Sequence, residues 1–452
     1  MSAAASVSPN LGISAKSSNA TGKKPNSETQ PFDGKKLKYA LQRTAQGLLY
    51  DATANKQHRV CSCHRNVASD GVAVYRNADA SGARFGNLIS CGSVWSCPIC
   101  SAKITEARRA DMQKAQSGWL LEGGSCLLNT LTFPHEHDMP LAELLEKFGK
   151  ALDLYKNSRT YKRIFGTAVA LIQQKISKGK PLKSIKEGQF PRLGTVRSLE
   201  VTHGVNGWHP HVHEVLFMQD DALLEAQRAK DELTAEWVRC LLAVGLGSND
   251  KLEHMLERAW DIRGGDYVSD YINKFGREPM PSEKFKELFG DKARQGWSIA
   301  HEVTKGISKI GREGRQIGEE WHFTPFQLLD WAMNGDEGAG QLFREFSRCF
   351  EGKRMNYWTN GLKDWFGINE IDDEALAEEG EPQPEEELVH RISSDDWKTV
   401  LETNARSEVL AVAAADGKEG LLKLLEEIKG RPRVYRGWFQ DHARPDISRF
   451  YR

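Results

Sequence analysis

Three histidines alternate in the segment Trp208-His-Pro-His-Val-His-Glu-Val-Leu-Phe217. Successive side chains of an extended strand point to opposite faces, so His209, His211 and His213 project from one face. Imidazole nitrogens bind divalent metal ions well, and ligands held on a stiff strand need little ordering when the ion arrives. The pattern therefore favours a metal site over a polar surface strand.

The preceding strand offers a carboxylate for the same ion. Residues 195–202 read as a strand, and the turn-forming residues 204–207 predict an antiparallel hairpin with the histidine strand. A loop made by the last two of these turn residues sets Glu200 opposite His213, and a loop made by all four sets it opposite His211. In either register Glu200 is a candidate ligand, and the alternative is a solvated strand carboxylate.

Two phenols and an ammonium group share a face of a predicted helix further along the chain. Tyr267, Tyr271 and Lys274 are spaced by four and three residues. A phenolate attacks phosphorus well but is scarce at neutral pH, so this chemistry needs a metal ion that polarises the phosphate. Without the histidine strand, core packing would be the better interpretation of these tyrosines.

The histidine strand followed by the tyrosine helix resembles the HUH endonucleases, specifically the rolling-circle replication initiators (Rep) of small plasmids. The resemblance implies that His211 and His213 bind a catalytic Mg or Mn ion, with His209 as an additional candidate. It also implies that Tyr271 is the nucleophile and that Tyr267, or water, acts in termination. Lys274 would orient or neutralise phosphate oxygens, or else be an ordinary exposed lysine.

The resemblance covers approximately residues 55 to 367. Residues 127–133 resemble the family's first motif, a buried strand, and the segments starting at Thr324 and Trp358 are supportive only. The run His135-Glu-His137 imitates the metal motif, but Pro134 ends the strand before it and its middle residue is charged. We interpret that run as a solvated loop.

The function that the resemblance implies is initiation of plasmid replication by metal-assisted transesterification. The products would be a 5'-phosphotyrosine and a free 3'-OH on the origin DNA. The sequence has no Gly-x-x-x-x-Gly-Lys-Ser/Thr motif, so a host helicase, or supercoiling, would have to unwind the origin, with host polymerase and single-strand-binding protein as further partners. Alternatives are a transposase or relaxase of the same superfamily, a non-catalytic zinc-dependent DNA-binding regulator, and a metallohydrolase with a water nucleophile.

A second metal site is predicted from clustered cysteines. Five of the eight cysteines lie within 40 residues, and they include a Cys-x-x-Cys knuckle, whose spacing suits tetrahedral zinc. Similar clusters precede the catalytic core in some Rep proteins. The preferred zinc ligands are Cys63, Cys91, Cys97 and Cys100, and the alternates are Cys61 and His64.

The formal net charge of zero hides two charged segments. Residues 369–390 contain ten Asp or Glu and no Lys or Arg, and we interpret them as an acidic linker that could shield basic surface. Between Asp153 and Glu187 there are nine basic residues and no acid, which could form a track for DNA phosphates. They are Lys156, Arg159, Lys162, Arg163, Lys175, Lys178, Lys180, Lys183 and Lys186.

The expected strands and helices that carry these residues indicate an α+β fold with an antiparallel central sheet and flanking helices. The resemblance implies that this fold is of the HUH/Rep nuclease type. We expect a disordered tail (1–35), a helix with the zinc-binding segment (36–115), the nuclease core (116–368), the linker (369–390) and a small helical accessory region (391–452). No apolar run of about 18 residues and no secretory signal occurs, so we expect a cytoplasmic monomer or dimer away from membranes.

Overall fold

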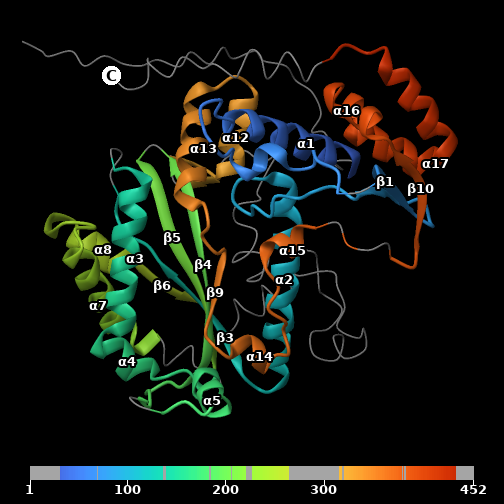
Figure 1. Ribbon diagram of the computed structural model, residues 1–452. Coiled ribbons are helices and arrows are strands. Elements are labelled where there is room, and N and C mark those ends of the chain that lie inside the picture. The colour runs from blue at the N-terminus through green and yellow to red at the C-terminus, as the bar shows by residue number, and fades with distance from the viewer. Residues whose placement is uncertain are drawn as a thin grey trace, which may run out of the picture.

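The computed structural model describes residues 31–68, 70–135, 139–182, 185–204, 206–219, 227–263, 315–317, 320–378, 380 and 383–433. They form helices and two antiparallel sheets, so the chain has the predicted α+β class (Figure 1). Within these ranges no helix is both long enough and apolar enough to cross a membrane.

The larger sheet carries the histidine strand at its centre. Its strand order is β6 (Trp260–Arg263), β3 (Ser125–Leu131), β5 (Gly207–Met218), β4 (Arg192–Gly204), β8 (Glu320–Phe323) and β7 (Arg315–Ile317), and β9 (Asn356–Trp358) also pairs with β4. All the pairings are antiparallel. The segment predicted as a buried strand, 127–133, corresponds to most of β3, which is largely buried.

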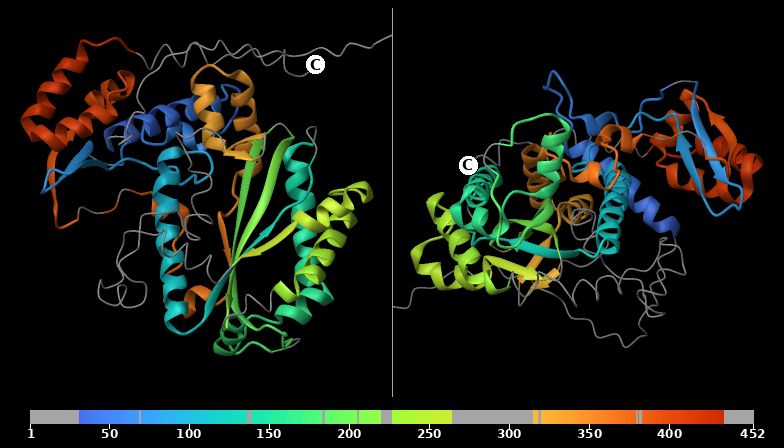
Figure 2. Two further views of the ribbon diagram at one scale, coloured as in Figure 1. Left: turned by 180° about the vertical axis from the view of Figure 1, so that it is seen from behind. Right: turned by 90° about the horizontal axis from the view of Figure 1, so that it is seen from below.

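Helices cover both faces of this sheet, as the two side views show (Figures 1 and 2). On one face lie α3 (Leu141–Asn157), α4 (Arg159–Phe165), α7 (Lys230–Ala243) and α8 (Leu252–Arg258), and on the other lies α2 (Pro98–Leu121). Helix α3 buries Leu144, Phe148, Leu152 and Tyr155, which recur at the spacing of one helical face.

Three helices lie at the end of the sheet where β4 turns into β5. They are α1 (Pro31–Leu48), α12 (Pro325–Met333) and α13 (Glu337–Phe350). Helix α12 begins with a capping box, in which the Thr324 backbone N–H donates to Oε1 of Gln327 at 2.8 Å. The shorter elements in the described residues are 3-10 helices at Arg59–Ser62 and Asn249–Lys251, α5 (Val169–Ser177) and α14 (Leu362–Trp365).

A smaller unit joins the early and late parts of the chain. Its sheet has the order β10 (Glu386–Ile392), β1 (Val72–Asn77) and β2 (Ala83–Gly86), and α16 (Ser394–Glu402) and α17 (Arg406–Lys429) pack on it. Its core includes Val74, Phe85, Trp397 and Leu421. We call these five elements the C-terminal unit.

The acidic segment 369–390 is more structured than the linker that we predicted. It contains α15 (Asp373–Ala377) and most of β10. Composition alone suggested a solvated segment, but five of its ten carboxylates form ion pairs with Lys or Arg outside the segment. None of these basic partners belongs to the basic run 156–186. The pairs are Glu370–Lys363, Asp373–Arg108, Glu374–Arg59, Glu386–Arg84 and Glu387–Arg76. At the other end of the chain, α1 begins at Pro31, inside the predicted tail.

A buried ion pair ties α3 to the back of the histidine strand. The side chain of Glu214 is fully buried and accepts a hydrogen bond from the ammonium group of Lys156. Burial alone would raise the pKa of Glu214, but Lys156, Arg197 and Arg192 together hold that pKa below its usual value. Glu214 is therefore ionised in the folded protein.

We expect Lys156→Met to lower the free energy of unfolding by about 3 kcal/mol, because it leaves a buried carboxylate without its closest counter-ion. The lowered pKa means that this contribution is present above the ordinary glutamate pKa and is lost as the pH falls. The difference between variant and wild type should therefore shrink in acid, as measured by urea unfolding. The matched control is Lys150→Met, which breaks an exposed pair with Glu146 and should cost less than about 0.5 kcal/mol. Equal losses in the two variants would contradict this account.

Candidate functional site

The β4–β5 hairpin brings three of the predicted ligands together. Glu200 pairs with His211, which is the register that the four-residue loop predicted, and the pairing continues to Gly204 with Gly207. Oε2 of Glu200 lies 3.5 Å from Nε2 of His211 and 3.4 Å from Nε2 of His213. Glu200 and His213 are buried and His211 is half-buried, so the group lies in the surface of the sheet and does not extend into solvent.

Hydrogen bonds fix which nitrogen each histidine presents. Nδ1 of His211 lies 3.3 Å from the carbonyl oxygen of His209 and donates to it, and Nδ1 of His213 lies 3.1 Å from the hydroxyl of Thr130 on β3. In both rings Nε2 is the atom that faces Glu200. A partner on one ring nitrogen orients the other toward an ion, and this is the usual arrangement around protein metal sites.

The donor set and its spacing fit a divalent metal ion. Donors about 2.1 Å from one ion lie about 3.0 Å apart at right angles and about 3.4 Å apart at the tetrahedral angle. The distances of 3.4 and 3.5 Å from Glu200 to the two imidazoles are close to the second value. Two imidazoles and a carboxylate suit several divalent ions, so the geometry does not select one of them.

His209 shares the face of the two ligands but belongs to a different contact group. Its Nε2 lies 2.7 Å from the hydroxyl of Thr132, and its ring stacks on His135 with centroids 4.6 Å apart. The centroid of the His322 ring lies 5.9 Å from that of His209. Burial, followed by the charges of neighbouring imidazoles, holds the pKa of His209 well below the usual value, so this ring is neutral.

Sequence reasoning missed three side chains that contribute to this site. We interpreted His135 as a solvated loop residue, but it is half-buried against His209, because the chain beyond β3 stays close to the sheet. His137 lies outside the described residues. The hydroxyls of Thr130 and Thr132 were also missed, although their alternation in the sequence could have placed both of them on the histidine face.

The predicted nucleophiles Tyr271 and Tyr267, together with Lys274, lie outside the described residues. The structure does fix where their segment starts. Strand β6 ends at Arg263, and Asp261 on it pairs with Thr130, which in turn pairs with His213. Strands in a sheet are about 4.8 Å apart, so Asp261 lies two strand spacings, or roughly 10 Å, from the ligand strand.

The predicted phosphate track is not beside this group. Lys156 lies on the opposite face of the sheet, where it pairs with Glu214, and Arg163 pairs with Glu232. Of the seven remaining basic residues, Arg159 and Lys162 are on α4, Lys175 is on α5, and the other four follow α5 in the sequence. Helices α4 and α5 lie near the start of β4, whereas Glu200 is near its end. Arg159, Lys178, Lys180 and Lys186 are exposed, Lys162 and Lys175 are half-buried, and Lys183 lies outside the described residues.

The four preferred zinc ligands form a second buried group. The sulfur of Cys63 lies 3.6 Å from that of Cys100 and 3.7 Å from that of Cys97, and the sulfur of Cys91 lies 3.6 Å from that of Cys100. Thiolates about 2.3 Å from a tetrahedral ion are about 3.8 Å apart, so the spacing and the donor chemistry both fit a tetrahedral metal. Cys63 directly follows the 3-10 helix Arg59–Ser62, and Cys91 lies in the segment between β2 and α2. Cys97 caps the start of α2, and Cys100 is in its first turn.

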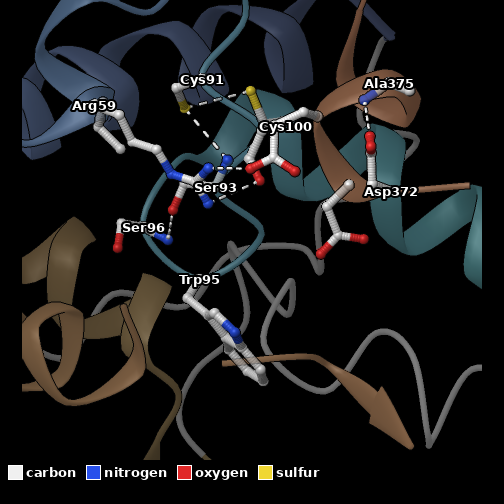
Figure 3. Close-up of polar contacts among 12 residues, drawn as sticks. Arg59, Cys91, Ser93, Trp95, Ser96, Cys100, Asp372 and Ala375 are labelled. Carbon is white, nitrogen blue, oxygen red and sulfur yellow. Dashed lines mark hydrogen bonds and ion pairs between the residues drawn. The ribbon is translucent and has the colours of Figure 1, made fainter. Parts of the chain in front are cut away.

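The loop that carries Cys91 is held from several sides (Figure 3). The backbone N–H of Ser93 donates to the Cys91 sulfur at 3.5 Å, and Arg59 donates to the carbonyl of Gly92 while pairing with Glu374 of α15. Gly92 has a φ of +60°, and a Cβ there would lie 2.8 Å from Glu374. The acidic segment therefore packs against the cysteine loop.

The alternates Cys61 and His64 are outside this group. The thiol of Cys61 contacts the carbonyl oxygen of Gln46, and burial raises its pKa to about 11. The His64 imidazole lies 3.2 Å from the Ser90 hydroxyl, and burial lowers its pKa to about 3. Both side chains are neutral and have partners away from the four sulfurs.

Two relatives give the comparison with known proteins. Over 388 residues, 78% of this chain and 80% of the relative, the chain is 24% identical to Protein rep of Streptomyces lividans. It is 29% identical over 171 residues to the Neomycin resistance protein of Streptomyces cyanogenus, which is 36% of this chain and 38% of that protein. No family model and no solved structure matches the chain.

We expect Thr130→Val to weaken Mn²⁺ binding by about 10-fold without changing the fold, because it removes the group that orients His213. Titration calorimetry on the full chain measures this, with circular dichroism to check the fold. The matched control is Thr195→Val, whose hydroxyl contacts Thr359 instead of a ligand. If Thr130→Val and Thr195→Val bind Mn²⁺ equally well, Thr130 has no orienting role.

Proposed function

We propose that the chain is a plasmid replication initiator that nicks one strand of origin DNA and becomes joined to it. The observation that carries the proposal is the group Glu200, His211 and His213 on paired strands. The similarity to Protein rep, which extends over most of both chains, supports it. The geometry of the three residues describes a candidate metal site, and the similarity to Protein rep is what connects this site to DNA.

Glu200, His211 and His213 are the residues that would hold a Mg or Mn ion. When bound, that ion would supply charge stabilisation to the scissile phosphate. The chain's own contribution is to keep Nε2 of both imidazoles aimed at one point through Thr130 and the His209 carbonyl. His209, whose Nε2 contacts Thr132, would shape the wall beside the ion.

Tyr271 is our candidate nucleophile. Its phenol oxygen would displace the 3'-oxygen of the scissile phosphate, so that a phosphotyrosyl bond forms as the P–O3' bond breaks and a proton passes to the leaving oxygen. One phosphodiester bond is exchanged for another, and no water is consumed. Tyr267 would take part in the second transfer at termination, and Lys274 would neutralise phosphate oxygens.

The position of β6 is compatible with this assignment. Tyr267 and Tyr271 follow Arg263 by four and eight residues, and Asp261 lies about 10 Å from the ligand strand. Eight residues of extended chain span at most about 29 Å. The described end of β6 is therefore near enough to the ligand strand for Tyr271 to reach it.

The four-cysteine group would hold zinc as a structural ion, because a closed, buried set of four thiolates leaves no open position for substrate. The partial match to the Neomycin resistance protein does not favour an antibiotic-resistance activity, since it spans little more than a third of that protein. DNA binding through the basic residues of α4 and α5 remains part of the proposal and should weaken steeply with salt.

We expect the full chain to form a covalent adduct with single-stranded oligonucleotides that tile the origin of its own replicon, in Mn²⁺ buffer. Mass spectrometry of the joined peptide should identify Tyr271, and Tyr271→Phe should reduce adduct formation at least 100-fold. Tyr357→Phe, which alters an exposed tyrosine on β9, is the matched control and should leave adduct formation unchanged.

Three outcomes would contradict the proposal. Cleavage without any adduct would indicate a water nucleophile, and DNA binding without cleavage would indicate a regulator. Cleavage of transposon ends or of a conjugative transfer origin, with no cleavage of the replication origin, would indicate a transposase or a relaxase.

A further inference from the structure

A buried chain of hydrogen bonds connects the C-terminal unit to the cysteine group. At the start of α17, Nη1 of Arg406 donates to Oε1 of Gln42 on α1 at 2.5 Å. The amide nitrogen of the same Gln42 side chain donates to the sulfur of Cys97 at 3.5 Å. Gln42 is fully buried and Arg406 is only 3% exposed, so water does not compete for these contacts.

A second residue of α1, Tyr39, also holds Arg406 in place. Its other terminal nitrogen donates to the carbonyl oxygen of Tyr39 at 3.2 Å, and its guanidinium lies over the Tyr39 ring at 4.3 Å. Tyr39 belongs to the hydrophobic core of the C-terminal unit. An arginine side chain stays protonated in proteins, so this fixed guanidinium places a positive charge behind the Gln42 amide, which contacts the Cys97 sulfur.

Apolar packing joins the same two parts of the molecule. Ile99 lies inside the knuckle, between Cys97 and Cys100, and packs against the cores of both the main body and the C-terminal unit. A movement of the knuckle would therefore alter a contact with the core of the C-terminal unit. The polar and the apolar contacts are independent observations that link the same two sites.

The hydrogen-bond chain would also stabilise negative charge on the cysteine sulfurs. Four thiolates around a divalent ion carry an excess of negative charge that is costly to bury. An amide N–H on the Cys97 sulfur and a guanidinium behind that amide offset part of this cost.

We propose that Arg406 and Gln42 are positioning residues of the cysteine metal site, and that they couple its occupancy by zinc to the docking of the C-terminal unit. The inference rests on the proposed zinc in that site. Coupling of this kind is reciprocal, so zinc tightens the docking of α17 by the same free energy by which docked α17 tightens zinc.

The experiment measures both directions on the full chain. Transfer of zinc to a chromogenic chelator should be about 10- to 100-fold faster in Gln42→Met and in Arg406→Gln than in wild type. Hydrogen exchange in the wild-type chain should rise in residues 394–429 when zinc is stripped and return when zinc is restored. The matched control Arg431→Gln breaks ion pairs with Glu408 and Glu427 inside the C-terminal unit and should leave zinc transfer unchanged.

The outcomes separate this inference from the zinc proposal. A purified chain whose metal content does not fall in Cys100→Ser overturns the zinc site and the coupling together. Zinc that is present but leaves Gln42→Met, Arg406→Gln and Arg431→Gln at the same rate overturns the coupling alone. If the first two variants do not fold, unchanged exchange in residues 394–429 after zinc removal from wild type overturns it as well.

Discussion

The register between β4 and β5 is the constraint on which the candidate site depends. Glu200, His211 and His213 meet because a carboxylate on one strand lies directly opposite an imidazole on the next. Side chains alternate between the faces of a strand, so a slip of one residue would move Glu200 to the side occupied by α3. The three ligands come together only in this register of β4 and β5.

Both ends of the hairpin are anchored by interactions that fix this register. At the turn, Trp208 stacks on Phe346 and donates to Glu345, which also accepts the first N–H of α3. At the other end, Glu214 is held by Lys156 of α3. Helix α3 therefore contacts the strand directly through Lys156 and indirectly through Glu345 of α13.

Helix α2 joins the two candidate metal-binding groups into one body. Its first turn carries Cys97 and Cys100, and its last turns place Met112 and Trp119 on the sheet face that the histidines share. We predicted a boundary at 115/116, but the helix runs through that position without a break. The uninterrupted helix α2 therefore connects the cysteine segment directly to the sheet.

Short-range sequence patterns predicted much of this site, whereas contacts between residues far apart in the sequence could not be predicted. The alternation of His209, His211 and His213 and the turn residues after Thr202 are short-range signals, and both lead to the observed strands. The choice of four cysteines followed from clustering and matches the group that the structure brings together. The stacking of His135 on His209 and the burial of Glu214 depend on segments that only the folded chain brings together.

The C-terminal unit sets an order of events during synthesis. Strand β1 pairs with β2 on one edge and with β10 on the other, and its Arg76 meets Glu387, a residue 311 positions later. Until β10 has left the ribosome, Val72 and Val74 lie in a strand with an open edge, which is prone to pairing with other chains. The nascent chain must keep this edge apart from its neighbours for most of its translation, and a truncated product would never cover it.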